Sequence, residues 1–141
     1  MKDETLKRQI LEVMAAHSLC VIATVTDDAK PEAAIVGFSQ NDDLELIIGT
    51  SRQTRKYANV QKNTQVAIVI GDTSAEIQYE GLIRELSAAE LDSQLEGHFK
   101  KLPGSPKYLE DPNQRWLLVR PTWIRLTVHE EPNRVEEMSF V

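Results

Sequence analysis

Between residues 18 and 83, short apolar runs rich in β-branched residues alternate with clusters of turn-forming residues. Each run has the length and composition of a β-strand, and we expect strands over residues 18–26, 33–38, 44–49, 66–70 and 77–83. The turn clusters at 27–31 and 41–43 are short, and connections of this length join antiparallel neighbours, whereas parallel strands need a long crossover. The pattern therefore restricts the chain to an antiparallel sheet or barrel rather than a doubly wound parallel sheet.

Three other segments carry helical patterns. Apolar residues at positions 6, 10, 13 and 14 share one helical face, which predicts an amphipathic helix over about the first sixteen residues. Residues 52–62 contain helix-forming residues and few apolar ones, which predicts a short helix, with Asn63 just past its end. Ser87 and Glu90 have the spacing of a capping box, and an apolar stripe continues from there to Pro103.

The last long strand shows a break in its alternation. Leu117 and Val119 stand at odd positions, but the apolar residues 124, 126 and 128 stand at even ones. A slip of one residue around Pro121 indicates a bulge or bend, which a barrel strand needs where it turns a corner. With a further short strand at 137–140 and no linker, we expect residues 1–141 to form one mainly β domain with an N-terminal helix and peripheral helices.

Composition narrows the functional classes. The net charge of −6 opposes nucleic-acid binding, because proteins of that class present a basic surface. The single cysteine, Cys20, allows neither a disulfide framework nor a multi-cysteine metal site. No apolar run approaches the roughly eighteen residues of a membrane span, and the N-terminus is charged. We therefore expect a cytoplasmic protein that binds neither nucleic acid nor a membrane.

One local segment departs from the acidic character of the chain. No acidic residue occurs between Glu45 and Asp72, although four cations do. Within it, Gly49 and Thr50 stand at a strand end, and Arg55 and Lys56 stand in the first turn of the expected helix. Free N–H groups at a helix N-terminus bind phosphate, and hydroxyl and cationic side chains would complete the shell. The segment predicts a site for a small anionic ligand, although by itself it is equally compatible with a solvated helix start.

Other chemistries have weaker support in the sequence. His17, His98 and His129 are isolated and lack carboxylates at metal-ligand spacing, so no metal site is predicted. No G-x-S-x-G motif occurs, which disfavours a serine hydrolase of that type. Trp116 and Trp123 fall on late strands, where aromatic residues belong to a core or an interface more often than to a cofactor site.

The ordered succession of motifs is more specific than any one of them. It comprises an N-terminal helix, PEAAIVGF at 31–38, GTSRQTRKYANVQKN at 49–63, VAIVI at 66–70, QYEG at 78–81 and a closing strand with Trp-Ile-Arg at 123–125. Over nearly the whole chain this succession resembles the pyridoxamine 5′-phosphate oxidase-like FMN-binding split-barrel proteins. The resemblance implies a six-stranded antiparallel split β-barrel.

The resemblance also implies a cofactor, a set of binding residues and a homodimer. In relatives, the positions of Thr54, Arg55 and Lys56 bind the FMN phosphate, and those of Gly49 and Thr50 lie beside the cofactor. The backbone of the strand that holds Ala34, Ile35, Val36 and Gly37 contacts the isoalloxazine edge. The second protomer closes the site, and Gln78 and Trp123 are our candidates for residues from that protomer.

Two departures from the family pattern bear on function. Pyridoxamine 5′-phosphate oxidases are longer and end in an arginine-containing R-L-x-P segment, which is absent from residues 135–141, so we do not expect that activity. Ala34 and Gly37 replace larger residues, which would leave room near the ring. The leading hypothesis is a flavin-dependent oxidoreductase acting on an unidentified small molecule, without an assigned catalytic residue. The alternatives are a flavin store or redox sensor, and a split barrel that binds F420 or haem.

Overall fold

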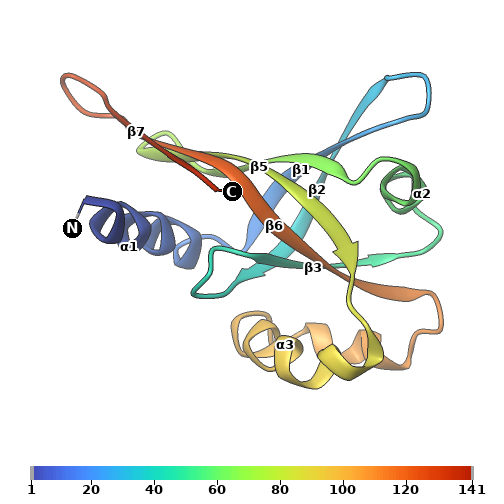
Figure 1. Cartoon of the computed structure of the whole chain (residues 1–141). Coiled ribbons are helices and arrows are strands. Elements are labelled where there is room, and N and C mark those ends of the chain that lie inside the picture. Colours follow the sequence, from blue (N-terminus) through green and yellow to red (C-terminus); the bar gives the residue numbers. More distant parts are fainter. Residues whose placement is uncertain (1, 141) are drawn as a thin grey trace.

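The structure, a computed structural model, describes residues 2–140. It consists of a curved antiparallel sheet with helices at its periphery (Figure 1). In chain order the elements are α1 (Lys2–Ala15), β1 (Leu19–Val25), β2 (Pro31–Gln40), β3 (Leu46–Ser51), α2 (Arg55–Lys62), β4 (Gln65–Gly71), β5 (Ala75–Glu85), α3 (Ala88–Lys101), the 3₁₀ helix η1 (Ser105–Glu110), β6 (Gln114–Val128) and β7 (Arg134–Ser139).

The sheet closes into a six-stranded antiparallel barrel. Its strand order is β3-β2-β1-β4-β5-β6-β7, and an additional pairing of β3 with β6 joins the two ends of the first six strands. Closure gives both strands at the seam a hydrogen-bonding partner along the paired residues, which removes two sheet edges. The seventh strand extends the sheet beyond the barrel along one half of β6. The expected split-barrel fold is therefore confirmed.

Alternation of side chains places the core inside the barrel. In β4, Val66, Ile68 and Ile70 are buried while the residues between them are exposed, as the period of two in a strand requires. The N-terminal helix adds Leu6, Ile10 and Met14 to the same apolar cluster, which identifies the helical face expected from the sequence. Cys20 is also buried there, as a small apolar side chain.

The strand β3 is buried on both faces. Leu46 and Ile48 point into the barrel, whereas Ile47 packs on the outside with Leu118 and with Leu95 of α3. This second cluster holds α3 against the outer face of β3 and β6 (Figure 1). The packing of α3 on the outer face explains why both faces of β3 are apolar.

A bulge in β6 accounts for the change in its hydrophobic phase. Glu80 of β5 pairs with Trp123, but the next residue, Gly81, pairs with Pro121, so Thr122 is the extra residue on β6. The hydroxyl of Thr122 donates to the carbonyl oxygen of Glu80 at 3.1 Å. The bend expected around Pro121 is thus confirmed and lies one residue beyond the proline.

Several element boundaries differ from expectation. The helix α2 begins at Arg55 rather than Arg52, because Thr54 caps it. Leu44 lies in the turn before β3, with a positive φ of 64°, rather than in the strand. The 3₁₀ helix η1 was not predicted, because a segment with three prolines between positions 103 and 112 has the composition of a loop. The last strand is longer than residues 137–140 and pairs with β6 from Arg134 onward.

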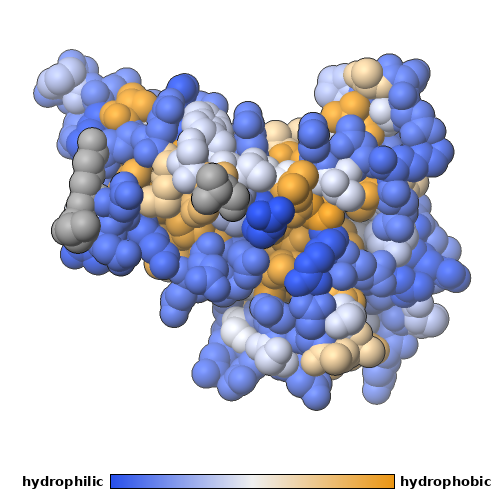
Figure 2. All heavy atoms as spheres, in the orientation of Figure 1, coloured by the Kyte–Doolittle hydropathy of each residue, from blue (hydrophilic) through white to orange (hydrophobic). Residues whose placement is uncertain are grey.

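Figure 2 shows a mainly hydrophilic face with hydrophobic residues gathered near its centre, and a saddle between the two upper projections. These projections are the β6–β7 and β1–β2 hairpins of Figure 1. No helix among residues 2–140 has both the length and the apolar character needed to cross a bilayer.

Candidate functional site

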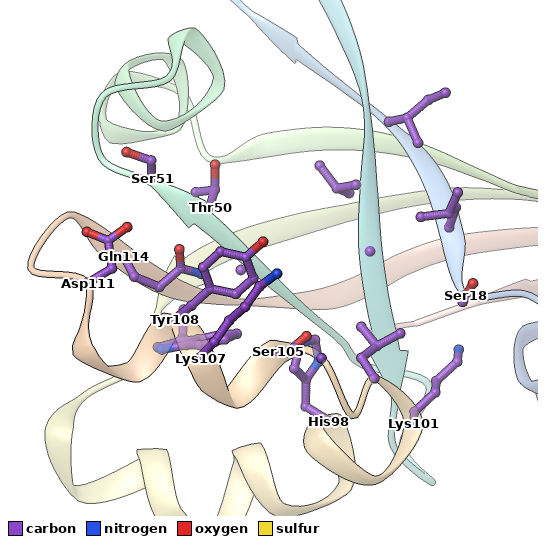
Figure 3. A pocket seen from close by; sticks show the side chains of 18 of the residues that line it. Ser18, Thr50, Ser51, His98, Lys101, Ser105, Lys107, Tyr108, Asp111 and Gln114 are labelled. Carbon is purple, nitrogen blue, oxygen red and sulfur yellow. The ribbon is translucent and has the colours of Figure 1, made fainter.

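The main cavity, of about 760 Å³, lies outside the barrel where β2, β3 and the start of β6 face α3 and η1. Figure 3 shows Thr50 and Ser51 at one end of it, near α2, and His98, Lys101 and Ser105 at the other. Lys107 and Tyr108, both from η1, lie between the two ends (Figure 3). A volume in this range suits a small molecule or an organic cofactor.

The start of α2 forms the first end of the cavity. Thr54 is the N-cap: its Oγ1 accepts from the N–H of Tyr57 at 3.3 Å and donates to the carbonyl oxygen of Ser51 at 2.9 Å. The hydroxyl of Thr50 lies 3.1 Å from that of Thr54. The hydroxyl of Ser51 accepts from the N–H of Gln53 at 3.1 Å. These bonds fix a small-residue loop beside a helix terminus, where the helix dipole favours an anion.

The two cations of this helix terminus have different surroundings. Lys56 lines the main cavity and also a second, adjoining cavity of about 380 Å³. Partial burial lowers the pKa of the Lys56 ammonium. Arg55 lines the second cavity, is 75% exposed, and pairs with Glu32 of β2 at 2.8 Å. Lys56 is therefore the cation that both cavities share.

Glu32 is held independently of Arg55. Its side chain is largely buried. The side-chain amide of Asn59 donates both to the carboxylate of Glu32, at 3.0 Å, and to the hydroxyl of Thr24, at 2.9 Å. Asn59 belongs to α2, so this network ties the helix to β1 and β2. A carboxylate that keeps a second donor can release Arg55 toward another anion at lower cost than an otherwise unpaired one.

The middle of the cavity depends on a glycine. A Cβ at Gly49 would lie 2.5 Å from Nε2 of Gln114 and 2.7 Å from Cζ3 of Trp116. Gly49 pairs directly with Trp116 across the β3–β6 seam, so both side chains lie over the glycine. On β2, a Cβ at Gly37 would lie 3.4 Å from Cδ1 of Leu102. Leu102 therefore fills part of the room expected from the small residue at position 37.

A buried histidine forms part of the opposite end. His98 of α3 is only 2% exposed, and its Nδ1 lies 2.7 Å from the hydroxyl of Ser39 on β2. Its ring makes edge contacts with Phe99 and Trp116, at centroid distances of 6.0 and 5.3 Å. Burial, followed by the nearby charge of Lys101, lowers the pKa of His98 to about 4. The imidazole is therefore neutral near pH 7.

Lys101 follows His98 by one helical turn and is half-buried. Its ammonium donates to the carbonyl oxygen of Met14 at 3.0 Å and to Oε1 of Gln40 at 2.6 Å, and it lies 3.7 Å from the ring centroid of Phe38. Burial lowers the pKa of Lys101 to about 8. Burial likewise raises the pKa of the Cys20 thiol to about 12, so this thiol is unreactive as a nucleophile near pH 7.

Most residues predicted for the site gather around these two cavities. The main cavity is lined by Ile35, Val36, Gly37, Gly49, Thr50, Thr54 and Lys56. The second cavity contains Ala34 and Arg55, together with Thr54 and Lys56 again. Gln78 and Trp123 line neither; they lie in β5 and β6, and their expected contribution from a partner protomer stays a prediction.

Sequence reasoning missed the wall that α3 and η1 add. His98 and Trp116 are buried, in agreement with packing roles, but both also line the main cavity, which the sequence does not indicate. The signal available in the sequence was weak: His98 falls next to Phe99 on the apolar stripe of α3. Within residues 2–140 no cluster of three or more metal-ligating side chains occurs.

Comparison with known proteins connects this geometry to one family. The family model for pyridoxamine 5′-phosphate oxidase matches residues 6–128. No curated protein matches the chain.

Three solved structures show how the fold is shared. General Stress Protein 26 from Bacillus anthracis is 24% identical, with a TM-score of 0.73 over 96% of this chain and 98% of that one. A pyridoxamine 5′-phosphate oxidase-related, FMN-binding protein from Nostoc punctiforme is 15% identical, with a TM-score of 0.61 over 96% and 91%. A haem-binding protein from Mycobacterium smegmatis is 15% identical, with a TM-score of 0.80 over 94% of this chain but 57% of that one. At these identities the likeness establishes the fold.

Proposed function

The chain belongs to the pyridoxamine 5′-phosphate oxidase family, and on that premise we propose that it binds FMN and acts as a flavin-dependent oxidoreductase on a small molecule. The observation that carries the proposal is the position of the α2 N-terminus. Its capped first turn, with Thr50, Thr54 and Lys56, forms one end of a cavity of about 760 Å³. A phosphate-binding terminus that opens into a space of this size matches a ligand with a phosphate at one end and a flat ring at the other.

The residues present fit the phosphate of FMN. The hydroxyls of Thr50 and Thr54 lie together at 3.1 Å, and Lys56 supplies a positive charge between the two cavities. Arg55 would join the phosphate by leaving Glu32, whose carboxylate keeps its hydrogen bond from Asn59. The exposed position of Arg55 lets its side chain turn without disturbing the core.

The ring of FMN would lie along β2 and β3, beside Gly37 and Gly49. Both glycines line the main cavity, but Gln114 and Trp116 lie over Gly49 and Leu102 lies against Gly37, so the ring would pack against these side chains. Bound FMN would supply hydride and electron transfer, while the chain binds it, orients it and limits the access of water.

We also propose that the protein is a homodimer that covers one face of the barrel. Val21 pairs with Ile35 on one side and with Val69 on the other, so the three side chains form a row on the same face. They are 38, 68 and 48% exposed, and Leu19 nearby is 59% exposed. An apolar row of this kind on a sheet face favours an interface.

The same row explains how a partner could contribute to the site. Ile35 lines the main cavity, while Gln78 pairs with Val69 and so extends the row on β5. In an isologous dimer formed through this face, Gln78 of one protomer can approach the cavity of the other. This supports the assignment of Gln78 as a residue contributed by the partner.

The decisive experiment is an FMN titration of the purified protein, followed by absorbance and calorimetry, with the double variant Arg55→Ala/Lys56→Ala. Each charged hydrogen bond to phosphate contributes about 1.5–3 kcal/mol, so we expect the Kd for FMN to rise by at least about 100-fold. The matched control is Lys7→Ala/Arg8→Ala, which removes two cations from α1 and should leave the Kd unchanged. Wild-type affinity in the first variant would refute the site.

The same spectra test the alternatives. Haem is favoured by one observation, a neutral histidine that lines the cavity, and haem uptake with a Soret band but no flavin uptake would replace FMN in the proposal. A flavin store or sensor would bind FMN in one-to-one ratio but show no turnover with nicotinamide donors or oxygen. Selective FMN uptake with donor oxidation supports the oxidoreductase.

A further inference from the structure

The polar groups at the α3 end of the main cavity are not explained by FMN binding at α2. His98 is only 2% exposed, and its ring lies against Trp116 and Phe99, two residues of the apolar cluster outside the barrel. A buried polar ring in apolar surroundings costs stability unless its nitrogens are hydrogen-bonded. One nitrogen, Nδ1, has the hydroxyl of Ser39 at 2.7 Å, whereas Nε2 has no protein partner among residues 2–140.

The hydrogen bond to Ser39 determines which nitrogen carries the proton. Ser39 is 3% exposed, and its hydroxyl has no partner other than His98 in the described part of the chain. A buried hydroxyl hydrogen needs an acceptor, and here only Nδ1 can provide it. Ser39 therefore donates to Nδ1, which leaves the proton of the neutral ring on Nε2. His98 offers that N–H as a donor.

The ring cannot easily exchange its two nitrogens. Trp116 and Phe99 contact it edge-on at interplanar angles of 75° and 64°, and they also contact each other at 5.7 Å. A side chain enclosed in this way keeps one rotamer, because rotation would need the aromatic neighbours to move. The donor is thus fixed in direction, which is what recognition of a ligand requires.

The charges near His98 favour an anionic acceptor. Lys101 lies at this end of the cavity and Lys107 lies between its two ends, and Lys101 uses two of its three donors in the bonds to Met14 and Gln40. Asp111 is the acidic residue among the lining side chains, and its Oδ1 accepts from the N–H of Asn113 at 2.9 Å. This end of the cavity is therefore positively charged in a chain whose net charge is −6.

We propose that His98 is a ligand-contacting residue whose Nε2–H donates to a carboxylate oxygen of a small organic acid, and that Lys101 and Lys107 select the anion. The inference rests on the proposed function in one respect: it assigns the α2 end of the cavity to FMN and the α3 end to the substrate. Ser39 is the positioning residue, because it sets the tautomer of His98. The low pKa of His98 agrees with a neutral donor at pH 7.

The binding test uses calorimetry with benzoate as the probe and benzamide as its uncharged counterpart, on both FMN-free and FMN-loaded protein. We expect benzoate to bind more tightly than benzamide. The variant His98→Leu should raise the Kd for benzoate by roughly 10-fold, since a hydrogen bond to a charged group is lost. His98→Gln, which retains an N–H donor, should recover part of the loss, and Lys107→Gln should raise the Kd by about 3-fold because that ammonium is exposed.

Matched variants separate this effect from general damage. His129 is exposed and does not line the main cavity, so His129→Leu should bind benzoate like the wild type. Lys100→Gln removes an exposed charge from α3 without touching the cavity and controls for Lys107→Gln. Equal benzoate affinity in the wild type, His98→Leu and Lys107→Gln would overturn the proposal, and so would equal binding of benzoate and benzamide.

A second measurement does not depend on any ligand. Long-range ¹H–¹⁵N spectra of the imidazole nitrogens report which one is protonated. At pH 7 we expect a neutral ring with the proton on Nε2, and in Ser39→Ala a mixture of the two tautomers. A proton on Nδ1 in the wild type would overturn the donor assignment. Because benzoate binding and the tautomer are both measured on FMN-free protein, failure of FMN to bind would leave this test intact.

Discussion

Replacement of Gly49 by alanine tests the packing at the centre of the site. The new Cβ would lie 2.5 Å from Nε2 of Gln114 and 2.7 Å from a ring carbon of Trp116, well inside normal contact distances. Gln114 can move its amide, but Trp116 is 7% exposed and packs against His98 and Phe99. The ring must therefore shift, or β3 must separate from β6 at the seam.

The expected cost follows from overpacking of a close-packed region, which destabilises a protein by about 1–3 kcal/mol. For a chain of this size, each kcal/mol lowers the Tm by about 3–4 °C, so a decrease of roughly 3–12 °C is expected. Thermal unfolding and urea titration at one fixed protein concentration measure it. Fluorescence should change as well, because Trp116 is one of two tryptophans.

A second glycine provides the control. Gly97 lies in α3 with no atom within 4 Å of an added Cβ, so Gly97→Ala should raise stability by about 0.5–1 kcal/mol through its effect on helix entropy. If Gly49→Ala matched the wild type in Tm, urea midpoint and tryptophan fluorescence, then Trp116 and Gln114 do not lie over this glycine as described. If both variants lost stability equally, the effect would not be specific to the seam.

Three further predictions concern the core, the pH dependence and the assembly. The hydroxyl of Tyr79, a residue 1% exposed, donates to the carbonyl oxygen of Leu44 at 2.8 Å and lies 3.2 Å from that of Val119. Tyr79→Phe should therefore lower the free energy of unfolding, measured by urea titration, by about 1–2 kcal/mol. An unchanged urea midpoint would contradict this role. Because folding lowers the pKa of His98 from 6.5 to about 4, the unfolded chain is protonated at His98 at a higher pH than the folded chain. The contribution of neutral His98 to the free energy of unfolding is therefore fully present above about pH 6.5 and is lost as the pH falls toward 4. Between pH 7 and 4, the urea midpoint of His98→Leu should decline less steeply than that of the wild type. Parallel curves for the two proteins would contradict this prediction. Ile35→Lys should convert the proposed dimer to a monomer, as measured by sedimentation. Leu109 is also apolar and exposed but lies on η1, so Leu109→Lys should leave the dimer intact. A dimer that persists in Ile35→Lys would place the interface elsewhere.

The fold was largely accessible from local patterns. The continuous apolar, β-branched run at residues 66–70 identifies a strand without any knowledge of neighbours, whereas the structure shows that Val66, Ile68 and Ile70 face inward. The capping box at Ser87 and Glu90 likewise identifies the start of α3, and the structure contains both of its reciprocal bonds. The phase slip near Pro121 predicted the bulge in β6, because the side-chain period is a property of extended backbone.

The site was accessible only in part. The segment around Thr54 and Lys56 was recognised because a helix terminus with adjacent hydroxyls and cations is a local anion-binding pattern. The opposite wall was not recognised: Ser39 and His98 are 59 residues apart in sequence and meet only because α3 packs across β2 and β3. Periodicity assigns His98 to the apolar stripe of α3, but it gives no reason why a polar ring should be there.

The sequence by itself determined the positions of the strands, their antiparallel arrangement, the two long helices and the anion-binding turn, since all of these depend on residues close in the chain. The tertiary structure decided the closure of β3 on β6, the covering of Gly49 by Trp116 and Gln114, the pairing of Arg55 with Glu32 and the role of Ser39 in fixing His98. Each of these is a contact between elements that folding brings together from distant parts of the chain. Their side chains acquire burial, a defined protonation state and a fixed direction only when the barrel and α3 are packed against each other.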